Sequence, residues 1–498
     1  MKKKSHISKV IILVCLLFQS FVFSQIGIGT ITPAASSILD VTSTTQGFLT
    51  PRMTTAQRNA ISSPTNGLMV YDTDLHSFQY YDSSTAGWKK IYSDNEGRLK
   101  YKLIKSTDVL ATVLASELAA GGGTKYLLDS ATYYEINGTV YLDRSVELNN
   151  AYLVGLDSGE DKLIRASGDL FVGTTGGSIK ILTLAALSGK VFDITGTGSI
   201  ASGTQTQNLI VRDCIIANSS NVGKIENMAL MFLSIVQFFN NTSGIIYKDI
   251  SKILLSNAAW FGNNSGTYET FQGTFGLVEK LGGFSEVIGA KIGLDVSGNP
   301  VITGDAVMES VVYTGTLTTG KYVNGYTTGG YTGYNFDNKW NVRCPGIPTE
   351  TDANATGEFS VNLTPGTGVT VTIDNSGTAA KILATTASTS LFRFSANNTG
   401  RLTYTGAKKR IIKFAGSLSF VAESAGKTGI YIYYIAKNGT IIGQSKVYGY
   451  TGSVTDTSPV PLSGSIEMNT NDYLEVYADY YSGSAGKIKV TSLTLTAF

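Results

Sequence analysis

The middle of the chain, residues 125–285, alternates short apolar runs with polar turns at a period of just over twenty residues. Three runs that each close on an Asn can be aligned, residues 209–218, 230–240 and 253–263, and the closing Asn residues are 22 and 23 positions apart. Runs of Ile, Val and Phe that end in Asn, Gly or Ser indicate a strand followed by a turn. Repeats of this length are typical of solenoids. The pattern predicts a right-handed parallel β-helix with one rung per repeat, and a β-sandwich with evenly spaced strands is the alternative.

The pattern changes towards the C-terminus. The β-helix is expected to occupy residues 125–345, and residues 346–358, rich in Pro, Thr, Asn and Gly without an apolar pattern, are predicted to be a linker. Residues 359–498 are predicted to form a separate all-β head, with a hairpin turn at Lys437–Thr440, where Asn-Gly separates two alternating runs. The expected head strands are Phe359–Leu363, Val369–Ile373, Ile411–Leu418, Gly429–Lys437, Ile441–Tyr448, Asp472–Asp479 and Ile488–Leu495.

The N-terminal part predicts a small α+β module at residues 25–92. Within it, residues 54–61 are expected to form a short helix capped by Thr54 or Thr55. Residues 68–72 and 77–82 alternate and predict a hairpin that places His76 in its turn.

Two further segments flank this module. Residues 1–24 have a Lys-rich start and an apolar run too short to span a bilayer, which is typical of a secretory signal peptide with Gln25 as the first mature residue. No other stretch predicts a membrane span. Residues 93–124 are predicted to be a connector whose helix, from Ser106 to about Ala120, caps the open end of the β-helix.

Three stretches resemble known families. Residues 25–92, with Gln25-Ile-Gly-Ile-Gly-Thr and Gly67-Leu-Met-Val-Tyr-Asp, look like the N-terminal module of secreted surface and tail-fibre-like proteins of Bacteroidetes. The phrase Ala151-Tyr-Leu-Val-Gly-Leu-Asp resembles the first coils of pectate-lyase-like β-helices, including phage tailspikes. From about residue 391, Gly400-Arg-Leu-Thr-Tyr and Asn471-Asp-Tyr-Leu-Glu-Val are similar to jelly-roll heads of the tumour-necrosis-factor and C1q type.

These resemblances imply an attachment module, a β-helix shaft and a trimeric head. Such heads are usually trimers, so the aromatic strand Gly429–Ile435 is expected to bury part of its surface against two further copies. A monomeric sandwich core is the alternative role for this strand. The resemblances also imply a location outside the cell or on its surface, or on a virion if the gene comes from a phage.

Composition narrows the classes of function. The chain has 498 residues, 55 Gly, 27 Tyr, only 15% charged residues and a formal net charge of +2. The short basic cluster Lys408-Lys409-Arg410 is the single one in the mature chain, so nucleic acid is not an expected partner. Of the mature cysteines, Cys214 and Cys344 either pair in an oxidising compartment or remain buried thiols.

The aromatic and Gly-rich stretch at residues 313–340 contains the candidate ligand-binding residues. Tyr and Trp present flat apolar faces with a polar tip, which stack on sugar rings, and the intervening Gly residues suit exposed loops. Packing at the end of the solenoid, or between chains of a trimer, is the alternative role. The candidates are Tyr322, Tyr326, Tyr331, Tyr334 and Trp340.

Catalysis has weaker support. A glycosidase needs two carboxylates that face one sugar, and the candidates Asp193, Asp213 and Asp249 do not share a phase of the repeat. No Arg/Lys-rich groove of the kind expected in a lyase accompanies them. No phosphate-binding loop, CxxC or HExxH motif occurs, and after His6 leaves with the signal peptide, His76 is the remaining His. We therefore expect no catalytic residues, no cofactor and no metal site.

The sequence as a whole favours an exported, homotrimeric, fibre-like adhesin or receptor-binding protein. Its shaft and head would present a glycan- or surface-binding face. Two alternatives stay open: an extracellular β-helix polysaccharide lyase or glycoside hydrolase, and a purely structural component of a virion or extracellular matrix.

Overall fold

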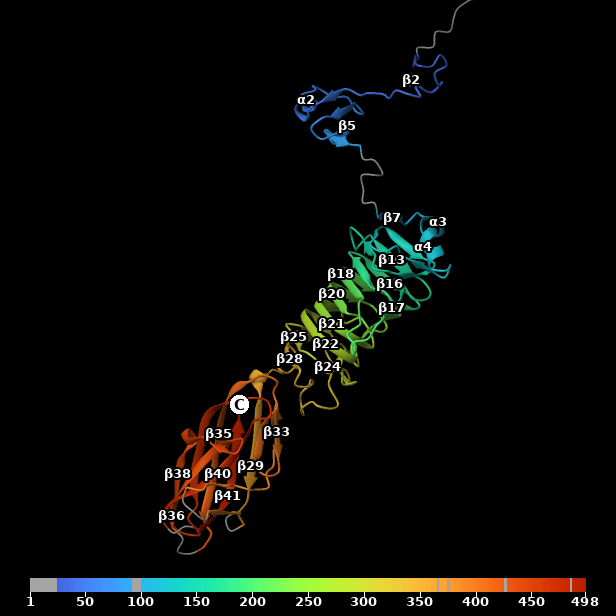
Figure 1. Ribbon diagram of the computed structural model, residues 1–498. Helices are drawn as coiled ribbons and strands as arrows, with labels where there is room; N and C mark the ends of the chain where they lie inside the picture. The colour runs from blue at the N-terminus through green and yellow to red at the C-terminus, as the bar shows by residue number, and fades with distance from the viewer. Residues whose placement is uncertain (1–24, 92–99, 365–366, 374–376, 425–427, 484–485) are drawn as a thin grey trace, which may run out of the picture. The chain divides into compact units, whose positions relative to one another are not determined.

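The structure is a computed structural model, and its regular elements are almost all β-strands (Figure 1). The described residues are 25–91, 100–364, 367–373, 377–424, 428–483 and 486–498. The expected signal peptide, residues 1–24, lies outside them. The chain divides into two compact units, Met1–Leu99 and Lys100–Phe498. The predicted all-β class, with a large parallel sheet followed by a β-sandwich, is confirmed.

The first unit is small. Thr54 caps helix α2 in a capping box with Gln57, and the predicted hairpin is present, with His76 in its turn at φ 48°. The elements of this unit are β1 (Ile26–Ile28), β2 (Leu39–Val41), β3 (Arg52–Met53), α2 (Thr55–Asn59), β4 (Met69–Asp72), β5 (Ser77–Asp82) and β6 (Gly87–Lys90).

The second unit begins with a coil of parallel strands, called the shaft, whose rungs pass in turn through three faces. Face 1 contains β7 (Tyr101–Lys105), β9 (Tyr133–Asn137), β12 (Tyr152–Val154), β15 (Gly177–Lys180), the first half of β18 (Asn208–Ala217) and of β20 (Leu230–Phe239), the middle of β21 (Ile245–Trp260) and of β22 (Thr267–Glu286), β25 (Ala306–Glu309) and β28 (Trp340–Arg343). Face 2 contains β10 (Thr139–Leu142), β13 (Lys162–Arg165), β16 (Thr183–Ala186), the ends of β18, β20, β21 and β22, and β26 (Val312–Thr314). Face 3 contains β8 (Lys125–Leu127), β11 (Ser145–Glu147), β14 (Phe171–Gly173), β17 (Lys190–Thr195), β19 (Asn221–Glu226), the starts of β21 and β22, β23 (Ile292–Asp295) and β27 (Lys321–Asn324). The short strand β24 (Val301–Ile302) pairs with β22 between faces.

The predicted repeat corresponds to the stacking of rungs. Leu209 lies beside Met231, which lies beside Ile253, and all three are buried in one continuous core. The period is lost where loops lengthen, at residues 196–207 and 325–339. Parallel pairing fixes the register of strands but not the length of the loops between them, so the repeat is visible in only part of the sequence.

Single residues with positive φ form the corners of the shaft. Between faces 1 and 2, the corner residues of successive rungs have φ between 53° and 61°; they are Ile181, Asp213, Ile235, Asn257, Gly282 and Ser310. Between faces 3 and 1, the corners are Asn227, Asp249 and Gly273. Gly, Asn and Asp tolerate this left-handed conformation, whereas a β-branched residue such as Ile235 is disfavoured there by roughly 1–2 kcal/mol.

A ladder of buried polar side chains runs inside the shaft, one position after the exposed Asn residues that close the aligned runs. Asn241 is 1% exposed; its Oδ1 accepts from Ser219 N, and its Nδ2 donates to Ile216 O and to Asn264 Oδ1 at 2.9 Å each. The exposed Asn240 makes a parallel contact outside the core. The side chains of this interior ladder form hydrogen bonds with main-chain N–H and C=O groups that have no partner in the neighbouring strands at this corner.

The predicted connector helix is two short helices. α3 (Leu110–Val113) and α4 (Ala115–Ala120) meet at Leu114, which is buried against the first rungs. The helices begin at Leu110 and not at Ser106, because residues 101–105 form β7, a strand of face 1 that pairs with β9. The first shaft strand therefore lies before the helices.

The second unit ends in a sandwich of two antiparallel sheets, called the head. One sheet has the order β32-β29-β41-β35-β39, with β30 on β41; the other has β33-β34-β40-β36-β37, with β31 on β40 and β38 on β36. The bounds are β29 (Thr356–Asn362), β30 (Val369–Ile373), β31 (Ala380–Lys381), β32 (Leu391–Phe392), β33 (Phe394–Asn397), β34 (Arg401–Tyr404), β35 (Arg410–Ala422), β36 (Gly429–Lys437), β37 (Thr440–Ile441), β38 (Val447–Thr451), β39 (Ser458–Met468), β40 (Tyr473–Gly483) and β41 (Gly486–Ala497).

Three head segments differ from the expectation. The hairpin at Lys437–Thr440 is confirmed, but the strand expected at residues 441–448 is interrupted by a turn in which Ser445 Oγ accepts from Ile435 N at 2.8 Å. β39 was not predicted because it contains two prolines, which are tolerated since β39 is an edge strand. The aromatic strand β36 already buries Tyr431 and Tyr433 inside the sandwich, so these two rings are not available to further copies.

We expect Asn241→Ala to lower the free energy of unfolding of the shaft by about 1–3 kcal/mol, because Ser219 N and Ile216 O lose their partner in the core. Asn240→Gly removes a side-chain contact at the surface, at a position whose φ of 55° Gly tolerates, and is the control, with an expected loss below about 1 kcal/mol. Denaturant unfolding followed by circular dichroism measures both. Equal losses for the two variants would contradict a structural role for the interior ladder.

Candidate binding site and trimerisation region

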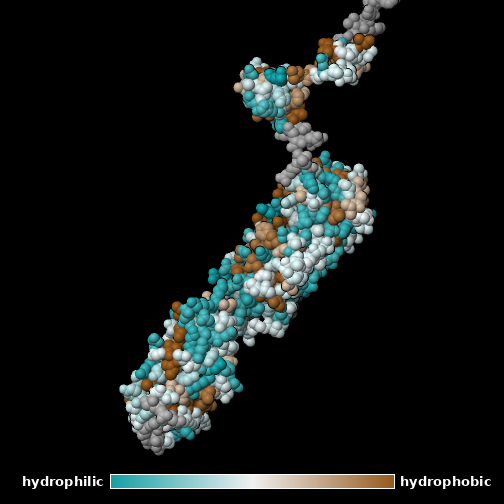
Figure 2. Space-filling view, in the orientation of Figure 1, coloured by the Kyte–Doolittle hydropathy of each residue, from teal (hydrophilic) through white to brown (hydrophobic). Residues whose placement is uncertain are grey.

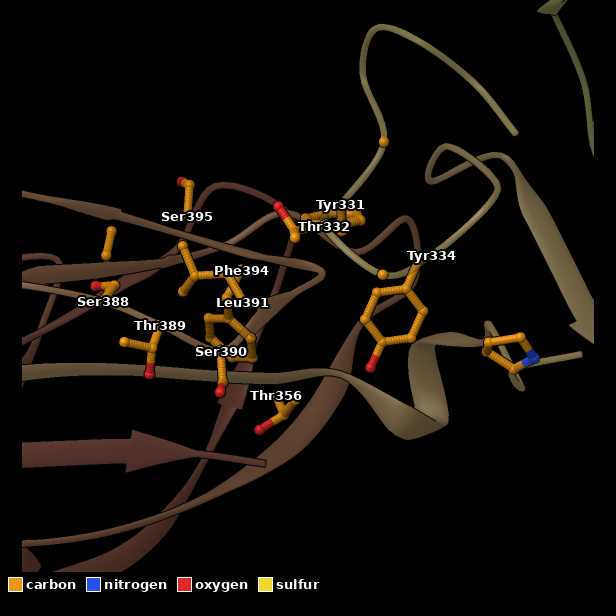
Figure 3. A pocket seen from close by; sticks show the side chains of 14 residues that line it. Tyr331, Thr332, Tyr334, Thr356, Ser388, Thr389, Ser390, Leu391, Phe394 and Ser395 are labelled. Atoms are coloured by element: carbon orange, nitrogen blue, oxygen red, sulfur yellow. The ribbon is translucent and has the colours of Figure 1, made fainter. Parts of the chain in front are cut away.

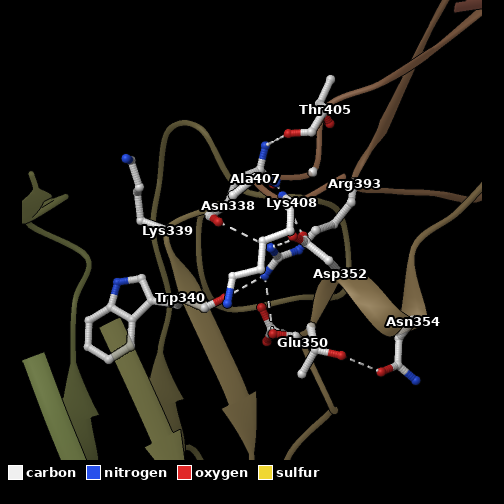
Figure 4. A network of polar contacts seen from close by, with 12 residues as sticks. Asn338, Lys339, Trp340, Glu350, Asp352, Asn354, Arg393, Thr405, Ala407 and Lys408 are labelled. Carbon is white, nitrogen blue, oxygen red and sulfur yellow. Dashed lines mark hydrogen bonds and ion pairs between the residues drawn. The ribbon is translucent and has the colours of Figure 1, made fainter. Parts of the chain in front are cut away.

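Within the segment at residues 346–358, expected to be a linker, residues 350–352 are buried at a junction between the last rung and the head, and the head strand β29 begins at Thr356 (Figure 4). At its centre is Arg393, which lies between β32 and β33 and is 1% exposed. Its guanidinium donates to the carboxylate of Asp352, in the 3-10 turn Asp352–Asn354, and to the carbonyl oxygens of Asn338, Trp340 and Glu350. A single side chain of the head, Arg393, therefore supplies hydrogen bonds to main-chain carbonyl groups at the end of the shaft.

Glu350 fixes the long loop at residues 325–339 from the other side. Its main chain forms an antiparallel bridge with Val342, and its carboxylate accepts from Asn335 N at 2.8 Å and Phe336 N at 2.9 Å. Burial raises the pKa of Glu350 above its usual range. The loop is held to the head as well, because Tyr331 Oη lies 2.6 Å from Thr405 Oγ1.

Beside this junction is a cavity of about 760 Å³ (Figure 3). Its walls come from the loop at residues 330–334 and from head residues on and before β32 and β33. Aromatic rings and hydroxyl groups dominate the lining, and none of its described side chains is charged. The lining residues are Gly330, Tyr331, Thr332, Gly333, Tyr334, Pro348, Thr356, Ser388, Thr389, Ser390, Leu391, Phe394, Ser395 and Ala396.

The five aromatic residues singled out in the sequence have different environments. Trp340 is fully buried and its Nε1 donates to Tyr326 Oη, which in turn donates to Pro300 O. Tyr322 is half-buried and donates to Gly315 O. Tyr331 and Tyr334 line the cavity. The structure therefore separates a packed group in the shaft from a pair at the cavity.

Tyr334 is the aromatic residue of the cavity with an unused polar group. One face of its ring stacks on Phe392, with the ring centroids 4.0 Å apart, so the opposite face is the one left for a ligand. Among the described residues, its hydroxyl has no hydrogen-bond partner. Tyr331, by contrast, uses its hydroxyl to join Asn338 and Thr405.

The hydroxyl wall of the cavity was missed by the sequence analysis. Ser388, Thr389 and Ser390 lie in a stretch of small polar residues without a motif, and Thr356 was assigned to the linker. Their meeting with the loop at residues 330–334 depends on contacts between segments far apart in the chain. No local pattern in the sequence carries that information.

The carboxylates considered for catalysis are not brought together. Asp213 and Asp249 are corner residues with positive φ, and Asp249 Oδ1 accepts from Thr274 N of the next rung at 2.8 Å, a structural contact between rungs. Asp193 pairs with Lys190 on face 3. Within the described part of the chain, no group of three or more His, Cys, Asp or Glu side chains is placed to hold a metal ion.

Two buried features of the shaft are closed to ligands. Glu269 and Lys280 form an ion pair of 2.7 Å inside the core, with side chains 1% and 3% exposed. Cys214 and Cys344 are both buried, and neither forms a disulfide. These groups therefore belong to the packing of the shaft.

The first unit exposes an unusual number of apolar side chains for its size. β1 and β2 pair in parallel, so Ile26 lies beside Leu39 and Ile28 beside Val41, and all four are 40–59% exposed. Figure 2 shows hydrophobic surface next to β2. A two-stranded sheet without a covered face is marginal in water, so these strands need a further apolar surface.

The first unit and strand β7 are similar to a known protein family. Residues 27–107 match a family described as a phage tail like trimerisation region. No curated protein matches the chain. The match covers β1 to β7 and supports a homotrimer and a phage tail-fibre-like protein at an extracellular or virion surface. No helix of the described residues combines the length and apolarity needed to cross a bilayer.

We expect Arg393→Met to destabilise the junction by about 3–5 kcal/mol, because the carboxylate of Asp352 stays buried without its partner. Arg343→Met, whose side chain is 69% exposed in a 3.7 Å pair with Glu309, is the control and should change stability little. Thermal unfolding combined with limited proteolysis near residues 344–356 measures the effect. Unchanged protection of this segment in Arg393→Met would argue against the junction.

We expect Ile28→Asp to convert trimers into smaller species, because it places a carboxylate in the exposed apolar surface of β1 and β2, where we expect further copies to pack. Val109→Asp is the control: Val109 is 69% exposed and stands at the N-cap of α3, where Asp is favoured. Light scattering across a dilution series gives the mass of both variants. A stable trimer of Ile28→Asp would exclude these strands from the interface.

Proposed function

We propose that this chain is the receptor-binding protein of a trimeric fibre, or an adhesin of the same form, and that its ligand is a neutral carbohydrate. The observation that carries the proposal is the cavity at the junction of shaft and head. Its lining combines aromatic faces with a row of hydroxyl groups and contains no charged side chain. That chemistry matches a sugar, which presents an apolar ring face and many hydroxyl groups.

The absence of charged side chains in the lining restricts the class of ligand that the cavity can bind and the kind of reaction that it can support. A sulfated, phosphorylated or uronic-acid polymer would be bound by cationic groups, and none of the lining side chains is cationic. Hydrolysis of a glycosidic bond needs a pair of carboxylates, and none of the lining side chains supplies one. The cavity therefore supports binding better than cleavage.

A trimer raises the overall affinity for a surface when each single site binds weakly. Each chain contributes one cavity, and the three cavities of a trimer can engage a surface with repeated glycans at the same time. A shallow sugar site with modest affinity then suffices for attachment. This agrees with the trimerisation region matched at residues 27–107.

We expect Tyr334→Ala to weaken binding to an immobilised neutral glycan by roughly tenfold per site, equivalent to about 1.4 kcal/mol, because the open face of the ring is lost. Ser390→Ala should weaken it less, since one hydroxyl group is removed from the wall. The measurement is a glycan array followed by surface plasmon resonance on the best ligand.

Tyr450→Ala is the matched control, because Tyr450 is 59% exposed on β38 and is not one of the residues that line the cavity. It should bind as the parent chain does. Binding confined to acidic glycans, or an undiminished signal from Tyr334→Ala, would contradict the proposed site. Release of oligosaccharides from the array would favour the enzyme alternative.

A further inference from the structure

The rung formed by the long strand β22 directs charged and polar side chains into the core of the shaft. Glu269 comes from face 3, Lys280 from face 1 and Ser285 from face 2. Their exposed fractions are 1%, 2% and 1%. One inward column from each face is therefore polar at the same level of the shaft.

The rungs on both sides of this one are hydrophobic at the same three positions. The residues that pair with the three polar ones are all buried in the core of the shaft. They are Ile245, Leu255 and Trp260 in the previous rung, and Leu294, Met308 and Tyr313 in the next. The polar side chains of β22 thus lie between two hydrophobic layers, away from water.

Glu269 and Lys280 are in contact, and little else stabilises their charges. Lys280 Nζ lies 2.7 Å from Glu269 Oε2. In the described part of the chain, Glu269 Oε1 has no hydrogen-bond partner, and no other hydrogen bond or ion pair reaches Lys280 Nζ. A buried ion pair offsets its loss of hydration only where further hydrogen bonds complete it. This pair lacks such hydrogen bonds.

The ion pair of Lys102 and Glu117 at the start of the shaft shows the difference. Its atoms are 2.6 Å apart, but the Glu117 carboxylate also accepts hydrogen bonds from Ser116 and Tyr134. The side chain of Lys102 is 27% exposed, so water reaches the ammonium group as well. The charges of this first pair are therefore stabilised by further hydrogen bonds and by solvent, and the pair in β22 has neither.

We propose that Lys280 and Glu269 condense to form an amide, an intramolecular isopeptide bond inside the shaft. Transfer of one proton from the ammonium group to the carboxylate gives an amine and a carboxylic acid, the uncharged state that a core without water favours. Lys280 Nζ then attacks Glu269 Cδ. The new N–C bond replaces the bond between Cδ and its hydroxyl oxygen, and this hydroxyl leaves with one amine hydrogen as water. Nothing is oxidised or reduced, and no cofactor takes part.

The surroundings of the pair favour this step. Contact between the two groups raises their effective concentration, and the exclusion of water protects the amide from hydrolysis. The amide is uncharged, so its formation removes two poorly compensated charges from the core. Its own polar atoms can bond to Ser285 Oγ and Tyr247 Oη, which are buried and have no partner among the described residues. Tyr247 is near enough for the charge of Glu269 to raise its pKa, after burial as the larger cause.

The bond joins face 3 to face 1 across the corner at Gly273, whose φ is 73°. The segment from Glu269 to Lys280 becomes a closed ring, so this rung cannot open completely unless a covalent bond breaks. A crosslink of this kind also restricts the unfolded chain and so favours the folded shaft. The inference depends neither on the trimer nor on the proposed sugar site, because the reaction takes place within one chain.

Mass spectrometry of the full chain, folded first and then denatured and digested with trypsin, tests the proposal. Trypsin does not cleave after an acylated lysine, so the expected peptide covers residues 253–291, is uncut at Lys280 and is lighter than its sequence by one water molecule. Fragment ions from single breaks between residues 269 and 280 should be absent, because the ring holds both parts together. Lys102 is the internal control: trypsin should cleave after it, since its pair with Glu117 stays ionic.

A peptide of residues 253–280 at its full mass, cut after Lys280, overturns the proposal, and this result needs no variant. The double variant Glu269→Leu with Lys280→Met removes both charges together, so that neither is left buried without its partner. Its intact mass should equal that of its sequence, whereas the parent chain should be lighter by one water molecule. The same loss of water from the double variant would place the reaction at other residues and overturn the assignment.

Discussion

The shaft depends on one constraint: each rung must turn through a tight corner while its inward side chains stay in line with those above and below. Single residues with positive φ satisfy it, and at the corner after face 2 the ladder of Ser219, Asn241 and Asn264 pairs the open main-chain groups. Because these corners keep the register fixed, outward side chains also align in columns. A column can then be apolar or polar over several rungs, and one face can carry columns of both kinds: Ile210 lies beside Phe232, whereas Lys180 lies beside Arg212.

At the end of the shaft, the carbonyl groups of the last rung have no further rung with which to form hydrogen bonds. Arg393 of the head donates to three such carbonyl oxygens and is neutralised by Asp352. The positive charge is buried only because its partners are complete. Arg393 Cζ also lies 5.3 Å from the ring centroid of Phe392, and Phe392 stacks on the cavity residue Tyr334, so the junction and the proposed sugar site are adjacent.

Different surfaces of the chain suit different tasks. The exposed apolar side chains of β1 and β2 suit permanent contact between copies, because their burial is favourable wherever shape allows it. The cavity is small, polar in its wall and uncharged, which suits reversible contact with a sugar. A fibre needs both properties: a rigid assembled shaft that does not dissociate, and weak sites that gain strength from repetition.

Local signals in the amino-acid sequence predict the kind of secondary structure and much of its order. The alternation of Leu209 to Ala217, the Asn residues at the ends of the aligned runs, and the Asn-Gly turn at residues 438–439 are local signals that follow from backbone sterics and side-chain period. Tertiary structure decided which side chains meet. Loops of unequal length separate the rungs, so the alignment of Leu209 with Met231, the corner position of Asp249 and the place of Ser390 and the loop at residues 330–334 around one cavity arise from pairing between distant segments. Trp340 is buried, whereas one face of the Tyr334 ring is free of the stacking contact with Phe392. This difference also arises from the tertiary structure, because the accessibility of a side chain depends on what packs against it and not on its neighbours in the chain.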